Sequence, residues 1–310
     1  MAAPLAVIAT DTVTATWRAM GTRVVVAVDG AEDLLDRARL RIDELERRWS
    51  RFRSDSDVTR MNETAGIPVF VHADTRRLVR HAIAAWERTD GACDATVLGA
   101  VVAAGYDASF ELLGERTAPL PGDPPVVPGC GSITVDDALG AVTLPAGVGF
   151  DPGAIGKGLA ADLVVAELIA DGASSAFVSI GGDIAMAGRP AAGDGWLVEV
   201  VDHAGEATSV ARLALADGAV ATSTTERRHW RVAGESRHHV IDPATGRPAQ
   251  TSARTVAVIA GDAWWAEALA TQLMLTPPER WVDVVGDRAA LTIDHDGRTH
   301  LLGGIRRYLR

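Results

Sequence analysis

Short apolar runs separated by turn residues fill the second half of the chain, and this spacing constrains its fold more than any other feature. The runs recur about every 8–12 residues, as strands joined by tight turns do. The segments expected to form strands are GWLVEVVD, ARLALADGAVATS, RHWRVA, RHHVIDPATG and TSARTVAVIAG, together with SSAFVSIGGDIAMAG, in which two glycines separate two strands. The pattern therefore predicts a mixed or antiparallel sheet.

Helical spacing of apolar residues marks other parts of the chain. Asp74 and Asp262 stand where two of these helices would have their N-caps, and Gly91 stands past the end of one. A strand with a glycine interruption is expected over residues 16–28. The expected helices cover residues 31–51, 73–91, 157–170 and 262–275. Helices packed outside such a sheet give the α+β class.

Length and composition narrow the organisation and the partners. A chain of 310 residues forms one large domain or two intimate ones, and the Pro/Gly-rich stretch 114–131 is a candidate connection between two lobes. The net charge of −11 and the lack of an arginine-rich block argue against a nucleic-acid partner. Two cysteines, Cys93 and Cys130, support neither a disulfide framework nor a metal cluster, so we expect buried thiols.

No segment predicts membrane insertion. The first residues carry no basic region ahead of their short apolar run, so they do not resemble a signal peptide. The longest apolar run, near residues 95–106, is too short to span a bilayer. A cytoplasmic protein is therefore expected.

The only lysine of the chain, Lys157, lies in the glycine-rich loop DPGAIGKG, which leads into a helix. The loop is not a P-loop, because Asp151 stands where that motif needs glycine and Gly158 follows the lysine. Glycines that allow close backbone approach, a helix N-terminus and a compact cation nevertheless favour an anionic ligand. The alternative is a glycine turn with a surface lysine.

Two further loops combine turns with polar side chains. Gly181, Gly182 and Asp183 form a tight turn that either approaches a ligand or joins a hairpin. In RHHVIDPATGRP, His238 and His239 point to opposite faces of a strand, so at most one points into a site as a general base. A solvent-facing histidine pair is the alternative.

Three other segments have two readings each. Glu267 and Thr271 lie four residues apart on one helix face, where they suit a hard cation such as Mg²⁺, or Thr271 bonds back to its own helix beside a surface glutamate. Asp94 caps the segment at Thr96 or Val97, or reaches a ligand. Residues 48–62, RWSRFRSDSDVTRMN, grip a ligand or form a solvated loop.

Taken together and in chain order, these segments resemble the ApbE-type FAD:protein FMN transferases, over about residues 15–280. The resemblance implies a T-fold-related α+β domain of two intimate lobes, here residues 12–305 after a short extension, 1–11. It also implies that the protein binds FAD and Mg²⁺, cleaves the FAD pyrophosphate, attaches FMN to a threonine or serine hydroxyl of an acceptor protein, and releases AMP. The motifs that carry it are AMGTRVVVAV, WSRFRSDSDVTRMN, CDATVLG, DPGAIGKGLAADLV, VSIGGDIAMAG, AVATSTTERR, HHVIDPATGRP and AEALATQLML.

Individual roles follow from the same resemblance. Lys157 matches the lysine that contacts FAD, and His239 matches the histidine that activates the acceptor hydroxyl, with Asp242 beside it in the motif. The implied metal ligands are the main-chain carbonyl of Ala154 and the side chains of Glu267 and Thr271. The residues implied to line the flavin nucleotide are Met20, Phe52, Asp94, Ile241 and the turn Gly181, Gly182 and Asp183.

Two departures from the family pattern leave alternatives open. Glu267 replaces an aspartate, and its longer side chain changes the geometry that Mg²⁺ demands. Thr224 stands where a glycine is common and restricts the backbone there. The alternative functions are therefore a Mg²⁺-dependent FAD pyrophosphatase, which forms FMN and AMP with water as acceptor, and a non-catalytic FAD-binding protein.

Overall fold

The computed structural model describes residues 12–310 except 115, 119–121, 191–194 and 206. The predicted N-terminal extension, residues 1–11, lies outside the described residues. The chain divides into two compact units, as the expectation of two lobes required. The first unit comprises Met1–Glu44, Lys157–Thr224 and Thr251–Arg310, and the second comprises Leu45–Gly156 and Thr225–Gln250. The Pro/Gly-rich stretch 114–131 lies inside the second unit, so the expectation that it separates two lobes is wrong.

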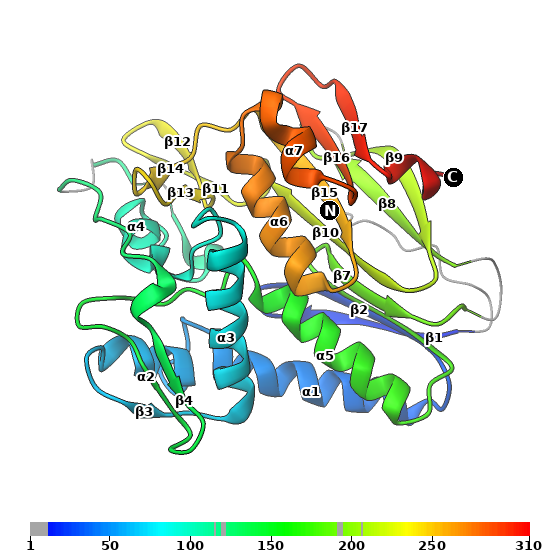
Figure 1. Ribbon diagram of the computed structural model, residues 1–310, viewed down its shortest axis with the longest axis horizontal. Coiled ribbons are helices and arrows are strands. Elements are labelled where there is room, and N and C mark those ends of the chain that lie inside the picture. Colours follow the sequence, from blue (N-terminus) through cyan, green and yellow to red (C-terminus); the bar gives the residue numbers. More distant parts are fainter. Residues whose placement is uncertain (1–11, 115, 119–121, 191–194, 206) are drawn as a thin grey trace. The chain divides into compact units, whose positions relative to one another are not determined.

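An eight-stranded antiparallel sheet forms the centre of the first unit (Figure 1). The strand order is β1-β2-β6-β7-β10-β15-β16-β17, so neighbours in the sheet are in most cases neighbours in the chain. The strands are β1 Val13–Ala19, β2 Thr22–Asp29, β6 Ser175–Ile180, β7 Asp183–Ala187, β10 Gly218–Thr224, β15 Ala253–Ala260, β16 Ala289–Asp294 and β17 Thr299–Gly303. This sheet confirms the antiparallel architecture that the turn spacing predicted.

The segment expected as one strand over residues 16–28 is in fact a hairpin. Met20 and Gly21 both have positive φ, at 51° and 64°, and they form the two-residue turn between β1 and β2. Glycine adopts this conformation without strain, whereas methionine does so rarely. The glycine interruption in the sequence therefore marks a reversal of the chain.

The two faces of this sheet are covered by different elements. Helices α5 Gly156–Ala170 and α6 Ala263–Leu275 lie across one face, where α6 contacts β10 and β15 (Figure 1). The hairpin of β8 Trp196–Asp202 and β9 Thr208–Leu215 packs on the other face, burying Trp196 and Leu213 against apolar side chains of the sheet. Every residue of β6 is buried, as expected of a strand covered on both sides.

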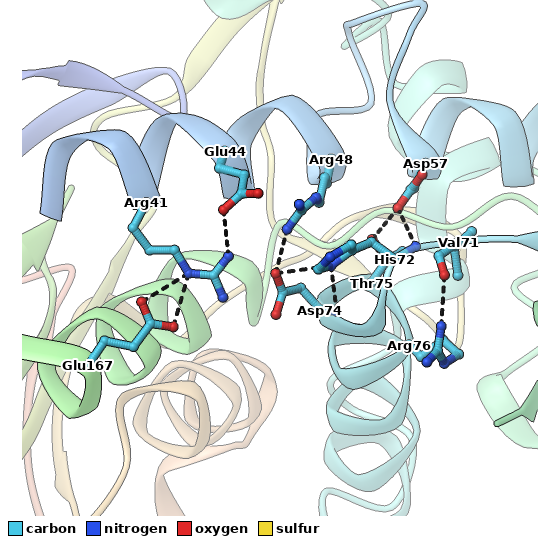
Figure 2. A network of polar contacts seen from close by, with 10 residues as sticks. All are labelled: Arg41, Glu44, Arg48, Asp57, Val71, His72, Asp74, Thr75, Arg76 and Glu167. Atoms are coloured by element: carbon cyan, nitrogen blue, oxygen red, sulfur yellow. Dashed lines mark hydrogen bonds and ion pairs between the residues drawn. The ribbon is translucent and has the colours of Figure 1, made fainter. Parts of the chain in front are cut away.

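The remaining helices of the first unit lie at its margins. Helix α1 Asp33–Trp49 begins in this unit, and Figure 2 shows Arg41 of α1 against Glu167 of α5. Arg41 Nε lies 3.0 and 3.1 Å from the two carboxylate oxygens of Glu167, and Arg41 Nη1 lies 3.0 Å from Glu44 Oε2. The short helix α7 Trp281–Val285 follows α6 and precedes β16.

The second unit is built of short elements and has a core of its own. In this core Trp230, Val232 and Ile241 pack against Ala100, Val101 and Tyr106. Its helices are α2 Asp57–Glu63, α3 Ala73–Arg88 and α4 Leu98–Ala103, and its strands are β3 Val69–Phe70, β4 Thr134–Asp136, β5 Ala141–Thr143, β11 His229–Val232, β12 Glu235–His238, β13 Ile241–Asp242 and β14 Arg247–Pro248. The strands pair as β3-β5-β4, β11-β12 and β13-β14.

Side-chain caps define the helices of this unit. The N-cap of α3 is His72, not Asp74 as the sequence predicted. Asp57 Oδ2 accepts hydrogen bonds from the backbone N–H of His72 at 3.0 Å and from Thr75 Oγ1 at 2.6 Å (Figure 2). Asp74 instead pairs with Arg48 at 2.6 Å, inside the first turn of α3. The His72 side chain thus makes the cap that the sequence assigned to Asp74, by accepting a hydrogen bond from the Asp74 N–H, and Asp57 of α2 holds the cap residue through its backbone N–H.

Candidate active site

The only lysine of the chain contacts two buried carboxylates in the first unit. Lys157 Nζ lies 2.9 Å from Asp183 Oδ2 and also forms an ion pair with Glu267 Oε1. Both acids are only 3% exposed. The second oxygen of Glu267 accepts a hydrogen bond from the backbone N–H of Gly158 at 2.8 Å. The structure thus brings together three residues that the sequence placed in three separate motifs.

The N-terminal ends of α5 and α6 approach each other closely around Glu267. A Cβ atom on Gly158 would lie only 2.5 Å from the carbonyl oxygen of Ala263, so this position requires glycine. Asp162 of α5 accepts hydrogen bonds from the backbone N–H groups of Ala263 and Trp264 at 2.8 and 2.9 Å. Asp262 is the N-cap of α6 by position, as predicted, but its side chain forms no capping bond. Asp162 satisfies the free N–H groups of α6 instead.

Asp183 is placed by a tight hairpin turn at one end of the sheet. Gly181 and Gly182, with φ of 69° and 107°, join β6 to β7, and Asp183 is the first residue of β7. A side chain on Gly181 would meet Thr22 Oγ1 at 2.7 Å, because the turn packs beside the start of β2. The alternative that this motif forms a hairpin is therefore correct, and the hairpin also places the Asp183 carboxylate beside Lys157.

The charges of this cluster do not balance. When ionised, Asp183 and Glu267 supply two negative charges, and Lys157 supplies one positive charge. Burial and the neighbouring Asp183 carboxylate raise the pKa of Glu267, while Lys157 acts in the opposite direction. A second cation would relieve the remaining negative charge, and carboxylates are the ligands that Mg²⁺ prefers. The donor set therefore fits a hard divalent cation.

Thr271 lies one turn after Glu267 in α6. Its hydroxyl donates a hydrogen bond to the backbone carbonyl of Glu267 at 3.1 Å. Thr271 thus bonds back to its own helix, as one of the two alternatives for this segment predicted. That alternative assumed a surface glutamate, but Glu267 is buried. Within the described part of the chain, no group of three or more His, Cys, Asp or Glu side chains has the arrangement of a metal site. The assignment of Thr271 and of the Ala154 carbonyl to a metal stays a prediction.

The predicted flavin-lining residues of the second unit are held by local hydrogen bonds. Asp94 Oδ1 accepts from the backbone N–H and the hydroxyl of Thr96 at 2.8 and 2.7 Å, and the Cys130 thiol lies 3.5 Å away. Asp94 therefore caps the helical segment at Thr96, which was one of the two alternatives that the sequence predicted for it. Burial and Asp94 raise the pKa of the Cys130 thiol to about 12, and both Cys93 and Cys130 are buried and outside any disulfide, as expected.

The histidine motif lies at the end of β12. His238 shares a hydrogen bond through Nε2 with the carbonyl of Ala249 at 3.0 Å, which gives it a structural role. His239 follows the strand, and its Nδ1 lies 3.4 Å from the carbonyl of Arg228. A proton on Nδ1 directed at that carbonyl leaves Nε2 as the basic nitrogen. Ile241 belongs to a core, and Asp242 uses its oxygens within its own turn, on Ala244 N at 2.9 Å and Thr245 Oγ1 at 3.1 Å.

Thr224, the second departure from the family pattern, ends strand β10. Its backbone is extended, and its hydroxyl donates to the carbonyl of Arg254 at 2.9 Å and accepts from Thr255 Oγ1 at 3.1 Å. A β-branched residue favours this conformation, so the restriction costs nothing here. Sequence reasoning missed this cross-strand pair because only the register of β10 with β15 brings the two threonines together.

Comparisons with known proteins identify the family of this chain and agree with its fold. The model of the ApbE family matches residues 20–292. The FAD:protein FMN transferase of Vibrio cholerae is 29% identical over 78% of this chain and 73% of its own length, and that of Salmonella typhimurium is 28% identical over 86% and 79%. The solved ApbE protein of Thermotoga maritima superposes with a TM-score of 0.85 at 27% identity, covering 96% of this chain and 99% of that one. In the described residues, no helix has the length and hydropathy of a membrane span.

Proposed function

The chain belongs to the ApbE family, and we propose that it is a transferase that cleaves FAD and attaches FMN to a hydroxyl of an acceptor protein, releasing AMP. One observation carries the proposal beyond the family match. Lys157, Asp183 and Glu267 form a cluster in which two buried carboxyl groups share one ammonium, beside a glycine-rich helix N-terminus. Such a cluster suits a divalent cation and an anionic nucleotide together.

Glu267 and Thr271 would hold Mg²⁺, and the carbonyl of Ala154 stays a predicted third ligand. When bound, Mg²⁺ supplies charge neutralisation and polarises the pyrophosphate. Asp183, for which the resemblance implied only flavin contact, is close enough to Lys157 to orient its ammonium. Lys157 would then donate to the pyrophosphate oxygens, where negative charge develops during cleavage.

His239 would act on the acceptor hydroxyl. The hydroxyl oxygen forms a new bond to the phosphorus of the FMN half, and the bond from that phosphorus to the bridging oxygen breaks. The hydroxyl proton passes to Nε2 of His239, and AMP leaves with the bridging oxygen. The hydrogen bond at Nδ1 fixes the ring in the tautomer that this step needs.

Two other functions use the same residues. In a FAD pyrophosphatase, water replaces the acceptor hydroxyl, so free FMN accumulates. In a non-catalytic FAD-binding protein, Glu267 would fail to support the metal and FAD would stay intact. The cytoplasmic location stays a prediction, which fractionation of cells would test.

Substitution of His239 tests the assignment of the base. His239→Ala should keep the Kd for FAD within about threefold and lower the rate of FMN transfer about 10²–10⁴-fold, the usual cost of losing a general base. His229→Ala is the matched control, because His229 is exposed on β11 of the same unit. Equal losses of binding and transfer in His239→Ala would show that this histidine is structural.

A further inference from the structure

Two residues of the segment 48–62, whose role the sequence left open between binding a ligand and forming a solvated loop, hold the loop that contains Ala154. Asn62 of α2 contacts both backbone groups of Phe150. Its Oδ1 accepts from the N–H of Phe150 at 2.7 Å, and its Nδ2 donates to the carbonyl of Phe150 at 3.0 Å. The amide thus binds the N–H and the carbonyl of one residue, which belong to two consecutive peptide units. The loop therefore begins from a fixed residue.

Arg51 contacts the next residue of this loop. Its Nε lies 3.0 Å from Asp151 Oδ2, and its Nη2 donates to the carbonyl of Tyr106 at 3.0 Å. The Arg51 side chain is only 8% exposed, which is unusual for arginine. Its guanidinium carbon also lies 4.1 Å from the ring centroid of Phe52 and 4.7 Å from that of Tyr106. One buried cation thus contacts an acid, a carbonyl and two aromatic rings.

Asp151, which pairs with Arg51, also forms a hydrogen bond within the turn that precedes Ala154. Its Oδ1 accepts from the backbone N–H of Gly153 at 2.8 Å, while its own N–H donates to the carbonyl of Ala95 at 2.7 Å. A Cβ atom on Gly153 would lie 2.9 Å from Asp151 Oδ1, so the turn requires glycine. Asp151 therefore joins three segments, which contain Phe52, Asp94 and Ala154.

A buried arginine of this kind has two possible uses. It either stabilises the second unit only, or it also fixes groups that contact a ligand. Phe52 favours the second use, because the residue is 41% exposed although its ring lies against the Arg51 guanidinium. An exposed ring that is held rigidly offers a flat apolar surface at little cost in conformational entropy.

We propose that Arg51 is a positioning residue of the active site. Through Asp151 it fixes the turn with the Ala154 carbonyl, and through its contact with the ring it fixes Phe52. The proposal rests on the proposed function, which assigns Ala154 to the metal and Phe52 to FAD. Residues that orient the groups around a metal commonly contribute about 10–100-fold to its affinity.

Five variants test the proposal without turnover. They are Arg51→Met, Arg51→Lys, Asp151→Asn, the double variant of Arg51→Met and Asp151→Asn, and the control Arg53→Met. Arg53 is the matched control because it lies two residues away and pairs with Asp55, while both side chains are largely exposed, at 48% and 59%. For each protein we would measure the thermal unfolding midpoint, the Kd for Mn²⁺ by electron paramagnetic resonance, and the Kd for FAD by fluorescence.

Arg51→Met and Asp151→Asn should each weaken Mn²⁺ binding about 10–100-fold. The double variant should lose little more affinity for Mn²⁺ than the weaker-binding single variant, because the two residues act through one contact. Arg51→Met should also weaken FAD binding more than Asp151→Asn does, since Arg51 contacts the Phe52 ring directly, whereas Asp151 acts on the turn before Ala154. Arg51→Lys, which keeps the charge but not the planar group, should recover part of the Mn²⁺ affinity.

The proposal would be overturned if Arg51→Met lost no more affinity for Mn²⁺ than Arg53→Met does. It would also be overturned if the fold-losses of the two single variants multiplied in the double variant. If Arg51→Met does not fold, Asp151→Asn decides the question, because Asn keeps the size of Asp151 and an acceptor for Gly153. A wild-type protein that binds neither Mn²⁺ nor FAD would overturn the proposed function and this inference with it. Wild-type binding with unchanged variants would overturn the inference alone.

Discussion

The carboxylate of Glu267 in α6 accepts a hydrogen bond from the backbone N–H of Gly158 in α5, at 2.8 Å. This contact is possible only because Gly158 lacks a side chain and lets the two helices approach. The same carboxylate forms an ion pair with Lys157, the residue before Gly158. Two adjacent residues of the glycine-rich loop thus fix the predicted metal ligand, one through its backbone and the other through its side chain.

Gly158→Ala should destabilise the protein by about 1–3 kcal/mol, the usual cost of overpacking. The added Cβ would lie 2.5 Å from the Ala263 oxygen and 2.7 Å from the Trp264 nitrogen, so the helices must separate and the Glu267 contact must lengthen. Urea unfolding measures the loss. Gly261→Ala is the control, since no atom lies within 4 Å of a Cβ there. Equal stability of the two variants would contradict the close packing.

Lys157→Met should destabilise the metal-free protein by about 3–5 kcal/mol, because it leaves the buried carboxylates of Asp183 and Glu267 without their cation. Saturating Mg²⁺ should restore part of the loss in this variant by supplying another positive charge. Urea unfolding with and without Mg²⁺ tests both statements. No loss of stability would mean that the ion pairs are absent in solution.

Glu267→Gln should remove the stabilisation of the protein by Mg²⁺. A ligand that binds only the folded state raises the free energy of unfolding by about 2.7 kcal/mol at a hundred times its Kd. Wild-type protein should show a rise of this order in thermal unfolding with Mg²⁺, and Glu267→Gln should show almost none. Glu167→Gln serves as control, because Glu167 pairs with Arg41 on the exposed side of α5. An unchanged response in Glu267→Gln would place the metal elsewhere.

Asp162 should make stability fall as the pH rises. Burial raises the pKa of Asp162 from 3.8 to about 7 in the folded protein. Because the folded pKa exceeds the unfolded one, the contribution is fully present below about pH 4 and is lost as the pH rises through about 7. The difference corresponds to at most about 4 kcal/mol, and the N-terminal dipole of α6 reduces it.

Asp162→Asn should flatten this dependence, since an amide does not titrate over that range. Urea unfolding of both proteins from about pH 4 to about pH 8 gives the two slopes. The variant should also lose one of the two hydrogen bonds to Ala263 and Trp264, because an amide has a single acceptor oxygen. Parallel slopes for the two proteins would show that Asp162 stays ionised throughout.

The sequence predicted the elements with strong periodicity and missed those set by distant contacts. The helices around Leu34 and Leu78 and the hairpin at Gly181 follow from local spacing, and the structure confirms them. The reversal at Met20 was missed because methionine rarely adopts a positive φ. The cap made by His72 was also missed, because histidine is not among the preferred N-cap residues, and the cap supplied by Asp162 was missed because this acid lies on α5 and caps α6.

In the candidate site, too, some residues were predictable from the sequence and others depend on contacts that only the fold creates. Lys157 and Glu267 stood out through residue type and spacing, and the structure joins them directly. The contact of Asp183 with Lys157 depends on the order of strands in the sheet, which no local pattern encodes. Arg51 gave no signal in the sequence either, because it is one of many arginines and only its burial distinguishes it.

Chromatography of the products of FAD tests the central claim most directly. Purified protein would be incubated with FAD and Mg²⁺, with and without an acceptor protein that carries a flavinylation-type threonine, and again with EDTA. The account predicts AMP release together with covalent flavin on the acceptor, and loss of both with EDTA. AMP with free FMN in every tube would identify a pyrophosphatase, and intact FAD throughout would contradict the account.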